Sequence, residues 1–237
     1  VKKIAKETEL ASLLAIPTAR SVREKLATRP EGIKTDYYFS TGNAVEQLTL
    51  PVGGLTLVGA PTSHGKSTLL RNLAIQVARE TSQGESILYF SLEEDYESTY
   101  VRLLNTYANI ELTSPGKVYN NISTIEEYYR SGSTRYMKHG TEAIFKDREA
   151  TFMKDYIESG RLRIYDRDFY ADELVDAIQY FAHKMKVKAV FVDYVQLLYK
   201  QGNKLQRNEE LKLIAKSLRQ LAKGEKLPII LACQLNR

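Results

Sequence analysis

Short, mostly apolar runs alternate with amphipathic stretches along the chain from about residue 54 onward. A run of this kind, bounded by polar or glycine positions, predicts a strand that is buried on both faces. The predicted strands are Leu55–Val58, Ser86–Ser91, Leu162–Tyr165, Ala189–Val192 and Ile229–Ala232. Apolar strands separated by helices are typical of a mainly parallel sheet.

The stretches between these runs repeat their apolar residues with the period of a helix. The clearest stripe runs through Leu174, Val175, Ile178 and Phe181, and it predicts one amphipathic helix. The predicted helices are Lys66–Arg79, 96–108, much of 123–158, Ala171–Met185 and Arg207–Ala222. The fold class that follows is α/β, with helices covering both faces of the sheet.

Residues 1–30 differ from the rest of the chain. Ile4, Leu10, Leu13 and Leu14 could form one helical stripe that ends at Pro17. Such an arm has too little apolar surface to fold alone, so it must dock on its own domain or on a neighbour. We therefore predict a short N-terminal helical arm over 1–30 and one large domain over 31–237.

Composition narrows the classes of protein. The chain has 237 residues and 43% hydrophobic residues, enough for a sizeable core. A single cysteine excludes a disulfide framework, and three histidines make a Cys/His zinc site a poor expectation. We expect a cytoplasmic protein because no apolar run approaches the ~20 residues that cross a bilayer. The net charge of +5 is compatible with a polyanionic partner.

The strongest chemical signal is the segment between the first strand and the first helix. It reads Gly59, Ala60, Pro61, Thr62, Ser63, His64, Gly65, Lys66, Ser67 and Thr68. A strand, a glycine-containing loop, Gly-Lys-Ser and then a helix form the context of a phosphate-binding P-loop. Backbone N–H groups at the helix start would face the phosphates of a nucleoside triphosphate. Lys66 would reach the β- and γ-phosphates, and Ser67 would bind Mg²⁺.

Magnesium at a P-loop needs a carboxylate at the end of a neighbouring buried strand. Asp193 directly follows the apolar run Ala189–Val192 and is the best candidate in the sequence. Hydrolysis also needs a base for the attacking water, and Glu93 and Glu94 follow the strand Ile87–Ser91. We expect that strand to lie beside the P-loop strand, so that both ends open into one crevice. The residue pattern does not choose between the two glutamates.

With these residues, the chain resembles the C-terminal motor domain of the DnaB-type replicative DNA helicases, a ring-forming branch of the RecA-like ATPases. Their P-loop has alanine at the first motif position, and Ala60 occupies that position here. Their Phe-Ser-Leu-Glu motif is matched by Phe90–Glu93, and Asp-Tyr-x-Gln-Leu by Asp193–Leu197. A Leu-Lys-x-Leu-Ala-Lys helix and a Ser-Gln-Leu-Asn-Arg strand end correspond to Leu218–Lys223 and Cys233–Arg237. The ordered matches cover about residues 40–237.

The resemblance implies a RecA-like P-loop ATPase that binds ATP and Mg²⁺ and moves on single-stranded DNA in replication. It implies Glu93 as the catalytic base and Gln234 as the sensor of the γ-phosphate, with Lys66 as the third catalytic residue. It also implies a homo-oligomeric ring, a hexamer in the complete protein, with a primase or a helicase loader as further partners. The source would be bacterial or encoded by a phage or plasmid.

Other readings stay open. The chain starts at Val1 and stops at Arg237 after an apolar run, so we expect a fragment, truncated at the C-terminus and weakly active or inactive alone. The family's arginine finger and central DNA-binding loop would follow Arg237. A RecA- or KaiC-like ATPase of recombination or signalling, or a nucleotide-binding assembly module, are the alternatives. The segments 200–207 and 128–138 could contact DNA, or they could be a surface loop and a packing surface.

Overall fold

A computed structural model describes residue 28 and residues 31–41, 44–108, 121–132, 142–199 and 206–235. The chain separates into two compact units, Val1–Glu31 and Gly32–Arg237, and every described helix and strand belongs to the second. The predicted helical stripe of the arm, the loop 200–205 and the tyrosine-rich segment from 133 lie outside the described residues. The arm's role therefore stays a prediction.

A five-stranded sheet forms the centre of the domain, in the order β3-β7-β6-β4-β5. The strands are β3 (Leu55–Ala60), β4 (Glu85–Ser91), β5 (Leu162–Tyr165), β6 (Lys186–Asp193) and β7 (Ile229–Gln234). All four pairings are parallel, as predicted. The register pairs Ala60 with Gln234 and Ser91 with Asp193, so four strands end at one edge of the sheet.

The order of the strands corrects one prediction. We expected the strand before Glu93 to lie beside the P-loop strand, but β7 and β6 separate β4 from β3. The strand that carries Asp193 is not the direct neighbour of β3 either, because β7 lies between them. Apolar runs show that strands are buried but carry no information about which strand pairs with which, and long-range pairing decided this point.

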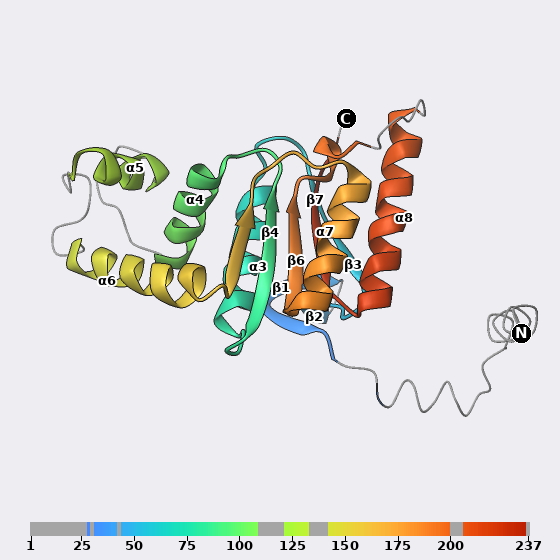
Figure 1. Ribbon diagram of the computed structural model, residues 1–237, viewed down its shortest axis with the longest axis horizontal. Helices are drawn as coiled ribbons and strands as arrows, with labels where there is room; N and C mark the ends of the chain where they lie inside the picture. The colour runs from blue at the N-terminus through green and yellow to red at the C-terminus, as the bar shows by residue number, and fades with distance from the viewer. Residues whose placement is uncertain are drawn as a thin grey trace, which may run out of the picture. The chain divides into compact units, whose positions relative to one another are not determined.

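Helices cover both faces of the sheet (Figure 1). One face carries α3 (Lys66–Arg79) and α4 (Tyr96–Ala108), with α5 (Asn121–Ser131) and α6 (Glu142–Phe152) packed beyond α4. The other face carries α7 (Ala171–Lys184) and α8 (Arg207–Glu225). Two separate apolar clusters fill these layers: Leu73, Tyr89 and Phe191 belong to the first, and Ile178, Val190 and Leu218 to the second. The prediction of a sheet covered on both faces is confirmed.

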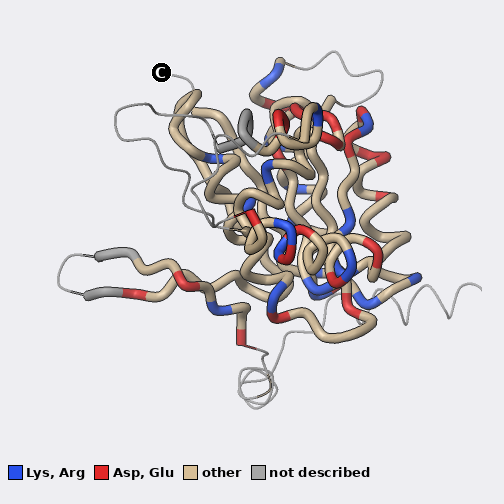
Figure 2. The backbone as a smooth tube through the Cα atoms, turned by 90° about the vertical axis from the view of Figure 1, so that its left-hand side faces the viewer, with Lys and Arg blue, Asp and Glu red and all other residues tan. Residues whose placement is uncertain are grey.

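A hairpin precedes the sheet and was not predicted. Strands β1 (Ile33–Thr41) and β2 (Ala44–Leu50) pair antiparallel and form a separate two-stranded sheet that projects from the body of the domain (Figure 2). Its base is tied to α3, since the Gln76 side chain accepts a hydrogen bond of 3.1 Å from the Asp36 backbone N–H. The polar residues in this segment hide the strand period, which explains the omission.

The helices predicted within 123–158 are α5, α6 and the π-helical turn η1 (Met153–Glu158) that continues α6. Tyr128 packs edge-on against Phe145, with ring centroids 5.4 Å apart, so it serves as a packing residue. Basic and acidic residues are interspersed along the described chain (Figure 2). Among the described helices, none has the length and apolar character needed to span a membrane.

Candidate functional site

The P-loop connects the carboxyl end of β3 to the start of α3. Gly65 precedes the helix with a φ of 79°, a left-handed conformation that favours glycine. Within the described part of the chain, no side chain caps this helix start, and its first turn contains no acidic residue. The free N–H groups and the positive end of the helix dipole therefore remain available for an anion.

Lys66 is a buried cation in this loop. The residue is 9% exposed, and its Nζ lies 5.5 Å from the centroid of the Tyr194 ring. No carboxylate among the described residues forms an ion pair with it. Burial of an unpaired charge is costly, whereas a bound anion would compensate it. Lys66 and the helix start thus form one site for negative charge.

Asp193 meets the P-loop from the end of β6. The Ser67 hydroxyl donates a hydrogen bond of 3.0 Å to Asp193 Oδ1, and the Tyr89 hydroxyl donates one of 3.1 Å to Oδ2. Asp193 is 4% exposed, so these donors replace water around a buried carboxylate. Burial, with the adjacent Asp193 charge, raises the pKa of Tyr89 well above its usual value, which keeps its hydroxyl protonated as a donor.

The Ser67–Asp193 pair fits magnesium. Two oxygen ligands at neighbouring octahedral positions, each ~2.05 Å from Mg²⁺, lie ~2.9 Å apart, close to the spacing of these two oxygens. No cluster of three His, Cys, Asp or Glu side chains occurs among the described residues. The metal would then take its remaining ligands from phosphate oxygens and water, as Mg²⁺ commonly does.

Tyr89→Phe tests the support of Asp193. The ring is 1% exposed and packs on Phe191, so phenylalanine keeps the packing and removes only the hydroxyl. We expect the free energy of unfolding to fall by about 1–2 kcal/mol, because a buried carboxylate loses a donor. Urea denaturation measures the change. The control is Tyr180→Phe, since Tyr180 is 58% exposed. Equal losses in both variants would contradict a specific role for the Tyr89 hydroxyl.

Two glutamates follow β4, and the structure gives them different surroundings. Glu94 Oε1 lies 2.9 Å from Arg102 Nε, and Glu94 Oε2 lies 3.6 Å from Arg71 Nη1. Burial raises the pKa of Glu94 despite these arginines. Glu93 is exposed and forms no ion pair with a described residue. Its charge acts on Tyr194, whose pKa is raised first by burial and then by Glu93 and Asp193.

A base for water needs a carboxylate whose oxygens are free to accept a proton. Both oxygens of Glu94 face arginines, whereas those of Glu93 form no ion pair with any described residue. The geometry favours Glu93 over Glu94, although the raised pKa of Glu94 points the other way. An arginine-paired carboxylate is a poor proton acceptor, and Glu94 pairs with two arginines.

Gln234 closes the other side of the loop. Its Nε2 donates a hydrogen bond of 2.7 Å to Thr62 Oγ1, so the end of β7 is tied to the P-loop. Within the loop, His64 Nδ1 lies 2.7 Å from the Thr62 carbonyl oxygen, a local contact that leaves His64 exposed. The structure thus brings together at one edge of the sheet the predicted residues Ala60 to Thr68, Asp193 and Gln234, with Glu93 on the adjoining turn.

Sequence reasoning missed two side chains that shape this site. The sequence predicts Tyr89 only as part of a buried strand, and no pattern indicates that its hydroxyl faces Asp193. Gln196 bonds to the backbone of Gln234 through both ends of its amide. Gln196 stands within the Asp-Tyr-x-Gln-Leu match, so the signal was present in the sequence, but its partner is 38 residues away.

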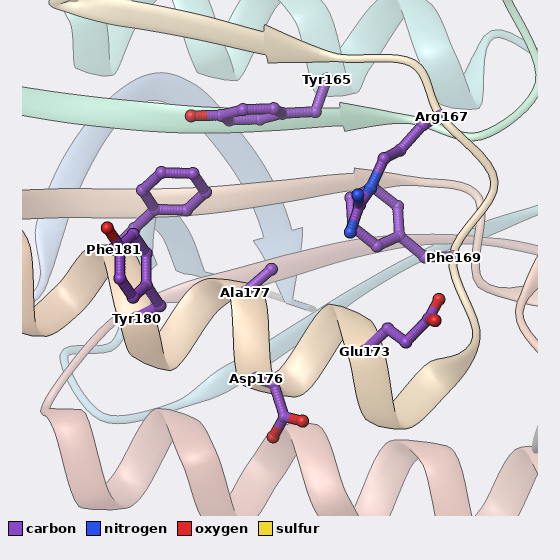
Figure 3. A pocket seen from close by; sticks show the side chains of 8 residues that line it. All are labelled: Tyr165, Arg167, Phe169, Glu173, Asp176, Ala177, Tyr180 and Phe181. Carbon is purple, nitrogen blue, oxygen red and sulfur yellow. The ribbon is translucent and has the colours of Figure 1, made fainter.

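A separate hollow of about 510 Å³ lies outside this site, between β5, the turn after it and α7. Figure 3 shows Tyr165, Phe181 and Phe169 around Ala177. The Arg167 Cζ atom lies 4.3 Å from the centroid of the Phe169 ring. It contains none of the predicted site residues. Its size alone does not make it the active site, since the loop, the buried lysine and the paired aspartate lie elsewhere.

The fold and the site together define a class. The parallel sheet begins with a strand, a loop that contains Lys66 and a helix, and the end of a second strand brings Asp193 to that loop. This is the architecture of P-loop nucleotide-binding domains. More particularly, the chain belongs to the family of the DnaB-like helicase C-terminal domain, whose family model matches residues 45–237.

Curated relatives agree with this family. The chain is 26% identical over 220 residues to the replicative DNA helicase DnaB of Mycoplasma pneumoniae, covering 87% of this chain and 40% of the relative. It is 27% identical over 192 residues to that of one Helicobacter pylori strain, covering 78% of this chain and 33% of the relative. The chain thus spans two fifths or less of the length of these relatives.

Solved structures agree on the fold. One solved ATPase domain matches with a TM-score of 0.61 and 18% identity, covering 79% of this chain and 59% of that one. A DnaB-like replicative helicase, described with its interactions with primase, matches with a TM-score of 0.62 and 18% identity over 79% of this chain and 40% of that one. The predicted RecA-like α/β fold is confirmed.

Proposed function

We propose that this chain is the ATP-hydrolysing motor domain of a DnaB-type DNA helicase. The observation that carries the proposal is the hydrogen bond of 3.0 Å between Ser67 Oγ and Asp193 Oδ1. It joins residues 126 positions apart in the sequence at the start of a helix, beside a buried lysine that pairs with no described carboxylate. A phosphate-bound magnesium ion fits that arrangement, and the family membership supports ATP as the nucleotide.

Each residue has a proposed role. The N–H groups at the start of α3 and the Lys66 ammonium would hold the phosphates of ATP. Ser67 and Asp193 would hold Mg²⁺, which when bound neutralises charge on the phosphates. Glu93 would orient a water molecule and accept its proton. Gln234, tied to Thr62 in this structure, would sense the presence of the γ-phosphate.

The wider function is proposed from the family. ATP turnover would drive movement along single-stranded DNA within a homo-oligomeric ring, a hexamer in the complete protein. A primase or a loader would be a partner, as suggested by the primase interactions of the similar helicase structure. An arginine from a neighbouring subunit would be needed for fast turnover. DNA unwinding of a forked duplex would separate this function from an ATPase of recombination or signalling.

Binding of ATP with Mg²⁺ is the first test. At ~100 times the dissociation constant, bound ligand adds about 2.7 kcal/mol of stability. For a domain of this size we expect the melting temperature to rise by about 5–10 °C. Differential scanning fluorimetry of this chain measures it, with Mg²⁺ alone and AMP as controls. No shift and no calorimetric heat with ATP or GTP plus Mg²⁺ would overturn the proposal.

A further inference from the structure

We infer that Gln196 is the positioning residue that holds Gln234 against the P-loop and links it to the start of α8. The inference rests on the proposed function, since it assigns Gln234 the sensing role described above. It concerns a side chain that touches neither the P-loop nor Asp193 through any described hydrogen bond. Gln196 would therefore act through Gln234.

The contact between the two glutamines is reciprocal. Gln196 Oε1 accepts a hydrogen bond of 3.0 Å from the Gln234 backbone N–H. Gln196 Nε2 donates a hydrogen bond of 2.7 Å to the Gln234 carbonyl oxygen. One planar amide thus satisfies both backbone groups of the residue at the end of β7. Among side chains of this length, only glutamine offers a donor and an acceptor together.

The pair of hydrogen bonds between the Gln196 amide and the Gln234 backbone, here called the clamp, lies where the pairing of β7 with β6 ends. The pairing of β7 with β6 ends at Leu231, which lies opposite Val192, so the last residues of β7 have no strand partner on that side. On the other side, β3 continues beside β7 as far as Ala60, which lies opposite Gln234. Gln196 therefore replaces the missing strand and fixes the backbone from which the Gln234 side chain reaches Thr62.

Gln196 is itself held by α8. It lies on the short turn η2 (Val195–Leu197), directly after Asp193 and Tyr194. Arg207, the first residue of α8, donates hydrogen bonds of 2.6 Å to the Gln196 carbonyl and 2.8 Å to the Leu198 carbonyl. Arg207 also pairs with Glu210. The chain of contacts runs from α8 through Arg207, Gln196 and Gln234 to Thr62.

The chain of contacts gives a mechanism for communication. The Gln234 amide now donates to Thr62, and a γ-phosphate beside the loop would compete for that donor. A change in this bond would move the end of β7, and the clamp would pass the movement to η2 and α8. A coupling of this kind is reciprocal, so a ligand that displaces the start of α8 would alter the preference of the site for ATP.

Gln196→Met and Gln196→Glu test the inference. Methionine keeps the length and removes both hydrogen bonds, whereas glutamate keeps the acceptor and loses the donor. Titration of this chain with Mg-ADP and with a non-hydrolysable Mg-ATP analogue measures the preference between them. We expect the preference for the ATP analogue to fall about tenfold in Gln196→Met, with ADP affinity changed less than about twofold. Gln196→Glu should lower the preference at least as much, because one of its carboxylate oxygens would face the Gln234 carbonyl oxygen.

The matched control is Gln179→Met, an exposed glutamine on α7 whose amide bonds only to Glu225 among the described residues. Arg207→Met should shift the preference in the same direction as Gln196→Met. A purely structural role would weaken both nucleotides equally in step with the melting temperature, and that result overturns the inference. If wild type binds neither nucleotide, the proposed function fails; if it prefers ATP and Gln196→Met keeps that preference, only the inference fails.

Discussion

Lys66→Ala is expected to remove most of the stabilisation by Mg-ATP. Among the described residues, Lys66 is the one buried cation that forms no ion pair with a carboxylate, so its contribution depends on the ligand. Charge-assisted contacts to phosphate are worth several kcal/mol together, and we expect the dissociation constant to rise about 100-fold. At the ligand concentration that stabilises wild type by about 2.7 kcal/mol, the variant should gain about 0.4 kcal/mol.

The same variant should not be destabilised without nucleotide. Removal of a buried, unpaired ammonium relieves a desolvation cost, so the melting temperature of the free protein should stay equal or rise. Lys216→Ala is the matched control, because Lys216 is an exposed lysine on α8. It should keep the full shift with Mg-ATP. A full shift in Lys66→Ala would remove Lys66 from the phosphate site.

Glu93→Gln is expected to stop ATP hydrolysis while nucleotide binding remains. A positioned base contributes ~100- to 10,000-fold to a rate, and glutamine has the same shape but cannot accept the proton. Glu93 is exposed and unpaired among the described residues, so its replacement should leave the melting temperature unchanged. The rate of ATP hydrolysis is measured as steady-state phosphate release by the full-length protein with single-stranded DNA. Fluorimetry measures the rise in melting temperature with Mg-ATP.

Glu94→Gln distinguishes the two carboxylates. Glu94 faces Arg71 and Arg102, but burial still raises its pKa, so loss of its charge should change the free energy of unfolding by less than about 1 kcal/mol. Hydrolysis should persist at a temperature where the variant is folded. If Glu94→Gln abolishes turnover at unchanged stability and Glu93→Gln turns over normally, Glu94 is the base and the assignment of Glu93 is wrong.

Local patterns predicted the elements well because each one depends on neighbouring residues. The helix over Lys66–Arg79 was predicted with the bounds that the structure shows, since its apolar stripe and the glycine before it are both local signals. The parallel sheet follows from apolar runs separated by helices. The hairpin β1–β2 was missed because its strands mix polar and aromatic residues, and their stability comes from pairing with each other and contact with α3.

The site was predicted in part for the same reason. The P-loop lies in one continuous segment, so Ala60 to Thr68 could be named from the sequence. Asp193 was named from its place at the end of a strand. Its contacts with Ser67 and Tyr89 join residues 126 and 104 positions apart, and no spacing in the sequence encodes them. The same holds for the clamp between Gln196 and Gln234.

The amino-acid sequence by itself determined the class of fold, the positions of the five strands of the central sheet and of the helices that cover it, and the loop suited to phosphate. These properties depend on side-chain periods and on backbone conformations that a few adjacent residues set. Only the tertiary structure decided that β7 and β6 separate β3 from β4 and that Tyr89 supports Asp193. It also decided that Glu94 faces two arginines, whereas Glu93 pairs with none of the described residues. These facts depend on which distant strands pair, and burial of the whole core selects that pairing rather than any local preference.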